Sequence, residues 1–202
     1  MKNQTFIVAG IGTDTGKTVT SAILCKALDA DYWKPVQAGD LDNTDSHKVK
    51  KWVPKARIHP EAYRLTTPMS PHGAAAIDGI TIDEEHLKVP HTANNLIVEL
   101  AGGLMVPLRN DYLIIDWVAS SGLPVVIVAD YYLGSINHTL LSLSALKNRN
   151  IPLLGIVFNG EKNTSTFDVI LHRSGVKCLL EIDREEEINE QIVSSYAREI
   201  SI

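Results

Sequence analysis

The residues of this chain that could do chemistry begin with a glycine-rich segment near the N-terminus. The segment Gly10–Thr18 reads Gly-Ile-Gly-Thr-Asp-Thr-Gly-Lys-Thr and follows the apolar run Phe6–Ala9. The backbone amides of such a loop can surround phosphate oxygens, while Lys17 neutralises the terminal phosphates and the Thr18 hydroxyl can ligate Mg²⁺. A helix that follows would point its positive N-terminal end at the same anion. The segment therefore predicts a phosphate-binding loop.

The spacing of this segment departs from the usual phosphate-loop pattern. The pattern Gly-x-x-x-x-Gly-Lys-Ser/Thr would need glycine where this chain has Ile11, and glycines stand at positions 10 and 12 instead. An ordinary glycine-rich strand-to-helix turn is the alternative interpretation. A β-rich apolar run before Gly-Lys-Thr and an amphipathic pattern over Val19–Leu28 favour the phosphate loop.

Further polar residues follow the other apolar runs. Lys34, Glu99 and Asn159 each stand at or just after the end of such a run. Ligands of an open parallel sheet bind beyond the carboxyl ends of its strands, so we expect these residues to converge at one edge. Alone, Lys34 would be an exposed loop lysine and Asn159 a turn residue. A second lysine beside a phosphate loop favours a role for Lys34, and Glu99 is placed to hold Mg²⁺.

Two other candidates have equally simple structural explanations. Asp45 and Ser135 each stand at the start of an expected helix, where both residue types are common helix caps. The histidines show no metal-ligand spacing, and we treat them as non-catalytic. Cys25 and Cys178 are far apart in the chain, so we expect reduced, buried thiols.

Apolar patterns predict an α/β fold. The near-continuous apolar run Pro124–Ala129 indicates a strand buried on both faces. Alternating strands and helices predict a single-domain, P-loop NTPase-like fold over residues 1–202, with a mostly parallel sheet and helices on both faces. Strands are expected at 6–10, 32–36, 96–100, 125–130, 153–158 and 177–182, and helices at 18–28, 44–52, 112–119, 135–147, 166–174 and 185–200.

Two segments stand outside this regular pattern. Residues 55–90 carry several prolines and little periodicity, so we expect a long irregular connection that lines a site. The acidic run Asp183–Glu190 is expected to form the solvated first turn of the closing helix, where the helix dipole favours negative charge.

Composition narrows the classes of partner and compartment. The chain has 202 residues and a formal net charge of −5, with acidic and basic residues mixed along it. This mixture argues against a nucleic-acid platform, which would show a basic stripe. No signal-peptide layout and no apolar run of membrane-spanning length are present in the sequence. We therefore expect a cytoplasmic protein without nucleic-acid or membrane partners.

Taken in order, the spaced motifs of this chain resemble those of the dethiobiotin synthetase family, a group of P-loop enzymes. The resemblance extends from the first strand through Asn159, and several motifs in the right order are more specific than any one of them. The matching segments are Gly12–Thr18, Lys34–Gly39, Ser70–His72, Glu99–Gly103, Pro107–Leu108, Asp116–Val118 and Leu133–His138.

The resemblance implies a reaction and its participants. The family adds CO₂ to an amine of 7,8-diaminononanoate, activates the resulting carbamate with ATP as a carbamic-phosphoric anhydride, and closes the ring to dethiobiotin in biotin biosynthesis. It therefore implies small-molecule substrates (the diamino acid, CO₂ and ATP), Mg²⁺, and a homodimer with sites at the subunit interface.

The resemblance also implies roles for individual residues. Lys34 and Lys17 would stabilise the transferring phosphoryl group, and Thr13 and Asp14 would face the substrate amines. The Mg²⁺ ligands would be Thr18, Asp45 and Glu99. Substrate would be bound by Thr13, Lys34, Ala38 and, from the second subunit, Gly134, Ser135, Ile136 and Asn137. ATP would be bound by Asp14, Thr15, Gly16, Lys17, Thr18, Val19, Asp45, Glu99, Leu100, Ala101, Gly102, Asn159 and Gly160, with Asn159 reading the adenine.

Three positions depart from the family pattern. Ala38 stands where the family often has a hydroxyl residue, so one hydrogen bond to substrate is missing. Leu100 replaces a glycine near the nucleotide, and its side chain is expected to crowd ATP. The segment Leu179–Asp183 lacks the family's Gly-x-(Ile/Leu)-Pro ending, which predicts weaker discrimination between bases.

Three other functions remain as alternatives. A ParA- or MinD-like regulatory ATPase would carry an extra lysine where this chain has Gly12. An amidoligase-related enzyme of cobalamin biosynthesis would carry a glutamine-hydrolysing domain, for which we expect no room in 202 residues. A degenerate paralogue that binds nucleotide without turnover is suggested by Ala38 and Leu100.

Overall fold

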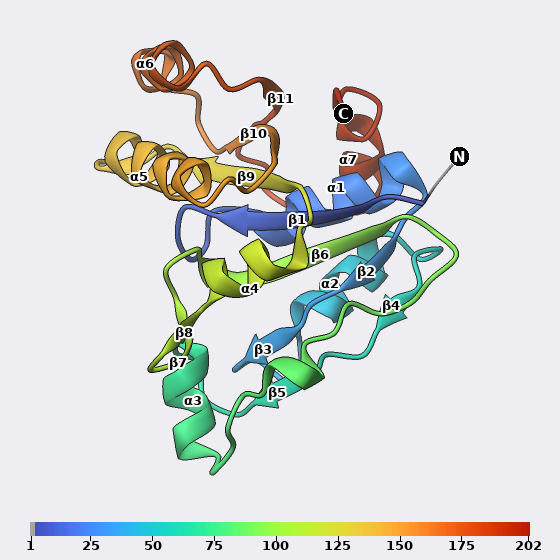
Figure 1. Ribbon diagram of the computed structural model, residues 1–202. Helices are drawn as coiled ribbons and strands as arrows, with labels where there is room; N and C mark the ends of the chain where they lie inside the picture. The colour runs from blue at the N-terminus through green and yellow to red at the C-terminus, as the bar shows by residue number, and fades with distance from the viewer. Residues whose placement is uncertain (1–2) are drawn as a thin grey trace.

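The computed structural model describes residues 3–202 and is built around a parallel sheet (Figure 1). The central sheet has 7 strands in the order β11-β10-β9-β1-β6-β2-β4, and every neighbouring pair is parallel. The expected α/β fold is confirmed. The strands are β1 (Thr5–Gly10), β2 (Asp31–Trp33), β4 (Ile58–His59), β6 (Leu96–Gly103), β9 (Val125–Asp130), β10 (Leu153–Asn159) and β11 (Cys178–Ile182).

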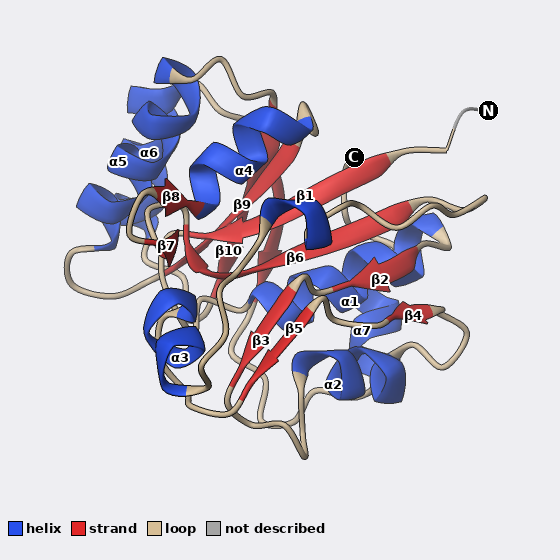
Figure 2. Ribbon diagram, turned by 60° about the horizontal axis from the view of Figure 1, so that its bottom comes forward, coloured by secondary structure: helices blue, strands red, loops and turns tan. Residues whose placement is uncertain are grey.

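Helices cover both faces of this sheet, as the apolar strands require (Figure 2). Successive side chains of β1 point to opposite faces, so Val8 packs with α1 on one side and Ile7 packs with α4 on the other. The first face carries α1 (Lys17–Leu28), α2 (Asp45–Trp52) and α7 (Glu190–Tyr196). The second face carries α4 (Ile114–Ser121), α5 (Ser135–Asn148) and α6 (Thr164–Ser174), while α3 (Pro71–Ile77) packs against short strands outside the central sheet.

The prediction of a single strand at 32–36 is wrong. The chain leaves the central sheet after Trp33, and β3 (Val36–Ala38) pairs instead with β5 (Tyr63–Leu65) in a separate two-stranded parallel sheet. Pro35 has no N–H to donate to a strand ladder, which accounts for the break. The break leaves Lys34 at the point where the chain exits the carboxyl end of β2.

Three other expectations need correction. The helix expected at 112–119 begins at Ile114, because Tyr112–Leu113 forms β8 and pairs with β7 (Pro107–Arg109). The closing helix is only α7, so the acidic run from Asp183 precedes the helix except for Glu190, which begins its first turn. The side chain of Asn189 caps α7 by accepting from the amides of its first turn.

Residues 55–90 are more regular than expected. They hold β4, β5, α3 and the short 3₁₀ helix η1 (Glu84–His86), all elements too short for a periodic apolar pattern. Cys25 is buried, but Cys178 is only half-buried, which corrects that expectation; both are free thiols. Within residues 3–202, every helix is too short or too polar to cross a lipid bilayer.

Candidate phosphate and metal site

The glycine-rich loop between β1 and α1 is tightly closed on itself. A Cβ at Gly10 would lie 2.5 Å from the Thr15 hydroxyl oxygen, and a Cβ at Gly16 would lie 2.4 Å from Nδ2 of Asn159. Gly16 also has φ 89 where it begins α1, a conformation that favours glycine. The loop therefore needs both glycines, and it brings Asn159 of β10 against the start of α1.

Lys17 is folded over this loop. Its Nζ donates to the carbonyl oxygen of Gly12 at 2.7 Å, and the residue is 7% exposed. Burial lowers the pKa of Lys17 to about 8, despite the nearby charge of Glu99. A poorly solvated ammonium held beside loop amides is suited to meeting a phosphate anion.

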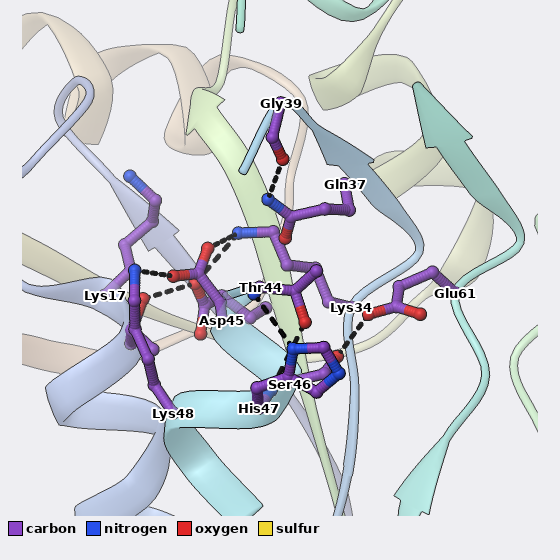
Figure 3. Close-up of polar contacts among 12 residues, drawn as sticks. Lys17, Lys34, Gln37, Gly39, Thr44, Asp45, Ser46, His47, Lys48 and Glu61 are labelled. Carbon is purple, nitrogen blue, oxygen red and sulfur yellow. Dashed lines mark hydrogen bonds and ion pairs between the residues drawn. The ribbon is translucent and has the colours of Figure 1, made fainter. Parts of the chain in front are cut away.

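Lys34 forms ion pairs with two carboxylates, and Figure 3 shows its side chain beside that of Asp45. Its Nζ contacts Oδ2 of Asp45 and lies 3.1 Å from Oε1 of Glu99, and the Thr18 hydroxyl donates to the same Glu99 oxygen at 2.9 Å. We call Thr18, Lys34, Asp45 and Glu99 the acid–lysine cluster. Its members come from α1, the exit of β2, α2 and β6, so the parallel topology assembles it at the carboxyl edge of the sheet.

The charged groups of this cluster, one ammonium and two carboxylates, lie largely out of water. Glu99 is 0% exposed and Lys34 is 5% exposed. Burial alone would lower the pKa of Lys34, but the charges of Glu99 and Asp45 outweigh burial and raise that pKa. Burial likewise opposes ionisation of Asp45, yet Lys34 holds the pKa of that carboxyl below its usual value. Both groups are therefore charged at neutral pH.

The oxygen atoms of the cluster fit a hard divalent cation. One hydroxyl and two carboxylates are the donor types that Mg²⁺ prefers, and Mg²⁺ completes its shell with water and phosphate oxygens. The Lys34 ammonium forms ion pairs with the same two carboxylates. Residues 3–202 contain no group of three or more His, Cys, Asp or Glu side chains placed to hold a metal ion.

The observed N-caps of α2 and α5 show whether Asp45 and Ser135 act as side-chain caps of these helices. The N-cap of α2 is Thr44, whose side chain accepts from the His47 amide, so Asp45 is not the cap and its carboxylate is available to the cluster. The N-cap of α5 is Gly134, and the buried Ser135 hydroxyl has no hydrogen-bond partner among the described residues. Both explanations of these residues as side-chain caps are therefore wrong.

A hollow lies beside the phosphate loop. It brings together Asp14, Asn159 and the start of α5, although these belong to three different elements. No residue of the acid–lysine cluster lines this hollow. Within a single chain, Gly134 and Ile136 therefore line a hollow with the loop residue Asp14 and not with Lys34. Its lining is Asp14, Val19, Asp130–Gly134, Ile136, Asn159–Asn163, Thr166, Asp183–Glu185 and Ile188.

The remaining candidates are Thr13 in the phosphate loop, Leu100 in β6 and Ala38 in β3. Thr13 is exposed, and its hydroxyl lies 3.6 Å from where a Cβ of Gly102 would stand. Leu100 is 4% exposed and packs in the apolar core with Leu108 and Trp117, on the face opposite α1. Ala38, half-buried, ends β3.

Three residues near the cluster carried no role in the sequence interpretation. Tyr32 donates its hydroxyl to Oε2 of Glu99 at 2.9 Å, and Lys48 lies 3.2 Å from Oδ1 of Asp45. Gln37 donates to the Gly39 carbonyl, while its own buried Oε1 has no partner among the described residues. Tyr32 resembled an ordinary core residue in an apolar strand. Lys48 did offer a signal, since it stands at i+3 from Asp45 on an expected helix.

Comparison with known proteins gives strong similarity over nearly the whole chain. A family model described as an AAA domain matches residues 4–191. A protein of Christiangramia forsetii named ATP-dependent dethiobiotin synthetase is 48% identical over 196 residues, covering 96% of this chain and 94% of that one. A protein of the same name from Chlamydia pneumoniae is 44% identical and covers 97% of this chain and 89% of its own.

Solved structures add the fold alone. A ParA family ATPase from Chlorobium tepidum has a TM-score of 0.61 at 14% identity, covering 97% of this chain and 98% of that one. The MinD protein of Pyrococcus horikoshii complexed with Mg-ADP has a TM-score of 0.57 at 14% identity, covering 98% of this chain and 96% of that one. These identities are far below those of the relatives above, so the likeness places the chain in the P-loop ATPase fold and says nothing further.

Proposed function

Since this chain belongs to the dethiobiotin synthetase family, whose members are ATP-dependent ligases, we propose that it carboxylates 7,8-diaminononanoate and closes the ring to dethiobiotin at the acid–lysine cluster. The observation that carries this proposal is the position of Lys34. A second buried lysine lies beside the phosphate loop and bonds to Glu99, which also accepts from the loop residue Thr18. A cation at that place suits a reaction that brings two anions together.

One amine first adds to CO₂ and loses a proton, which gives a carbamate, and two further bond-forming steps complete the proposed reaction. The carbamate attacks the γ-phosphorus of ATP through an oxygen, and ADP leaves. The second amine then attacks the carbonyl carbon of the carbamic-phosphoric anhydride, and inorganic phosphate leaves as the cyclic urea closes. Both anions must be brought together before the carbamate attacks, so positioning and charge neutralisation dominate catalysis.

Lys17 and Lys34 divide this neutralisation between them. Lys17, already held by the Gly12 carbonyl, would turn to the β- and γ-phosphates. Lys34 would stabilise the carbamate and the transferring phosphoryl group. When bound, Mg²⁺ would be held by Thr18, Asp45 and Glu99 and would supply charge stabilisation at the phosphate oxygens.

Substrate recognition is proposed for the exposed part of the loop and for the end of β3. Asp14 has φ 56 and an exposed side chain, which leaves its carboxylate free to pair with a substrate ammonium. Thr13 lies beside it, and Ala38 marks the place where a hydroxyl is absent. We propose that Ala38 reduces affinity for the diamine without blocking its binding.

Nucleoside binding is proposed for the hollow lined by Asn159. The Asn159 side chain lies against Gly16 at the start of α1, within reach of the base of a nucleotide whose phosphates fill the loop. Gly160 and the segment from Asp183 line the same hollow.

A homodimer is proposed from the exposed apolar side chains around α5. Leu133 is 104% exposed, Leu141 is 60% exposed and Ile136 is 36% exposed, which is unusual for three large apolar residues so close in sequence. A second copy of the chain would cover them and bring its Gly134–Asn137 segment, with the buried Ser135 hydroxyl and the positive end of α5, toward the substrate carboxylate.

A single-turnover reaction tests the proposed function. The protein is mixed with γ-labelled ATP, Mg²⁺, bicarbonate and 7,8-diaminononanoate, and both phosphate and dethiobiotin are measured. Phosphate that matches dethiobiotin and depends on the diamine supports the proposal. Phosphate released without the diamine would identify a regulatory ATPase, and no phosphate would identify a degenerate nucleotide-binding paralogue.

A further inference from the structure

Tyr32 lies beneath the acid–lysine cluster, in the middle of β2. Its side chain is 0% exposed and points to the α1 face of the sheet, where it packs with Val8 and Ile97. The register of β2 against β6 pairs Tyr32 with Ile97, two residues before Glu99. Residues two apart on a strand share a face, so the tyrosine ring and the Glu99 carboxylate lie on the same side of the sheet.

The three donors to Glu99 are divided between its two oxygens. Oε1 accepts from the Thr18 hydroxyl at 2.9 Å and from the Lys34 ammonium at 3.1 Å. Oε2 accepts from the Tyr32 hydroxyl at 2.9 Å. Oε1 is therefore the oxygen turned toward the phosphate loop, while Oε2 is held from below by a donor that belongs to no ligand-binding element.

The Tyr32 hydroxyl is a fixed donor. Its oxygen lies 2.9 Å from Oε2 of Glu99, and the hydroxyl donates because a carboxylate oxygen accepts. The ring is enclosed by core residues and cannot leave. In contrast, the terminal torsion of a glutamate is soft and broadly distributed, so the carboxylate takes its orientation from its donors.

We propose that Tyr32 is a positioning residue, which fixes the orientation of the Glu99 carboxylate and thereby sets the affinity of the cluster for a divalent cation. The inference rests on the proposed function, because it needs the cluster to bind a metal together with nucleotide. In the proposed reaction Lys34 and Thr18 would turn to substrate and metal, and Tyr32 would remain as the donor to Oε2. Groups that orient metal ligands in this way typically change metal affinity about 10- to 100-fold when removed.

Tyr32→Phe isolates the hydroxyl, because it keeps the ring and its packing. Mn²⁺ binding in the presence of a non-hydrolysable ATP analogue is measured by electron paramagnetic resonance, together with the melting temperature. We expect the dissociation constant for Mn²⁺ to rise about 10- to 100-fold. The matched control is Tyr63→Phe, which removes a hydroxyl that accepts from the Asp83 amide on the edge of the protein. The control should leave Mn²⁺ affinity unchanged.

A double-mutant cycle distinguishes positioning from a purely structural role. If Tyr32 acts through Glu99, Tyr32→Phe should cause no further loss of Mn²⁺ affinity in a Glu99→Gln background. If Tyr32→Phe alone does not fold, the double variant and Glu99→Gln are compared instead. Glu99→Gln removes the buried charge that would otherwise lose its hydrogen-bond donor. An additional loss in that background would overturn the inference. So would a lower melting temperature with unchanged Mn²⁺ affinity.

The outcomes separate this inference from the proposed function. Wild-type protein that forms dethiobiotin while Tyr32→Phe binds Mn²⁺ normally overturns the role of Tyr32 alone. Wild-type protein that binds Mn²⁺ with the analogue but forms no dethiobiotin overturns the proposed reaction, and the Tyr32 comparison still stands. Wild-type protein that binds no Mn²⁺ with the analogue overturns both the metal site and the role of Tyr32.

Discussion

The ammonium of Lys34 lies 3.1 Å from Oε1 of Glu99, inside the protein and beside the phosphate loop. The same ammonium contacts Asp45, so one cation is shared by two carboxylates and a net negative charge remains. A divalent cation on these oxygens would weaken both contacts and leave Lys34 free to meet an anion. The lysine and the metal therefore have linked positions in the proposed reaction.

Lys34→Ala should reduce turnover far more than nucleotide affinity. Loss of one stabilising group at a developing charge lowers kcat by about 10²- to 10³-fold. The affinity for ATP should change little, because Lys17 and the loop amides remain. Single-turnover rates and isothermal titration with ATP measure the two effects. Equal losses would make Lys34 a nucleotide ligand only, whereas Lys17→Ala should damage affinity and rate together.

Lys50→Ala is the matched control for the lysine experiment. Lys50 lies on α2 near Asp45 in sequence, but its ammonium donates to the carbonyls of Pro54 and Ala56 at the surface. Its removal should leave both turnover and ATP affinity near the wild-type values.

Leu100→Ala should destabilise the protein without improving nucleotide binding. The Leu100 side chain is buried on the face opposite the loop helix, and a buried leucine shortened to alanine loses about 2–5 kcal/mol of unfolding free energy. Urea denaturation and ATP titration provide the measurements. Tighter ATP binding by the variant would instead support the expectation that Leu100 crowds the nucleotide.

Leu141→Glu should weaken the proposed homodimer. Leu141 is 60% exposed on α5, and an apolar contact in a two-fold interface is lost from both copies at once. Burying one leucine is worth about 1.5–3 kcal/mol, so the dimer dissociation constant should rise more than about tenfold. Sedimentation velocity measures association. Ile202→Glu, a charge placed at another exposed apolar side chain, is the control; a monomeric wild-type protein would contradict the dimer.

Base selectivity should be weak. The family's Gly-x-(Ile/Leu)-Pro ending is absent, and the exposed side chains of Asp183 and Arg184 line the hollow proposed for the nucleoside. Dissociation constants for ATP, GTP and CTP, measured by competition, should lie within about tenfold of one another, a difference of about 1.4 kcal/mol. A strong preference for ATP would show that Asn159 and its neighbours discriminate well without that ending.

Asp31→Asn should remove an acid-dependent part of the stability. Burial opposes ionisation of Asp31, but the hydrogen bonds from Asn94 and Thr92 outweigh burial and hold its pKa below the usual 3.8. A carboxyl with a lowered pKa stabilises the fold above the unfolded pKa, and this contribution is lost as pH falls through the folded value. The stability difference between wild type and variant should therefore shrink as pH is lowered from 7 toward 3.

Urea unfolding at a series of pH values measures this difference. His59 also contacts the Asp31 carboxylate, at 3.0 Å, so the network joins the first residue of β2 to β4. Asp42→Asn, an exposed carboxylate, should leave the pH dependence unchanged. A stability difference that stays constant with pH would show that the Asp31 network does not depend on its charge.

Much of the cluster was predictable from sequence because the strand ends are predictable. Apolar runs located β1, β6, β9 and β10, and the parallel topology then required Thr18, Glu99 and Asn159 to share one edge of the sheet. The resemblance added Asp45 as a Mg²⁺ ligand and gave Lys34 and Lys17 a shared role at the transferring phosphoryl group. Local signals failed where elements were short, as for β3 and β5, because two- and three-residue strands carry no measurable period.

The sequence by itself determined the phosphate loop, the α/β class and the family, since each depends on residue types at fixed spacings. Only the tertiary structure decided that Leu100 faces the apolar core while Glu99 faces the loop, and that Tyr32 donates to Glu99. These relationships depend on which strand lies beside which and in what register. A spacing of 67 residues between Tyr32 and Glu99 leaves no local pattern to read, whereas the register of β2 on β6 places the two side chains in contact.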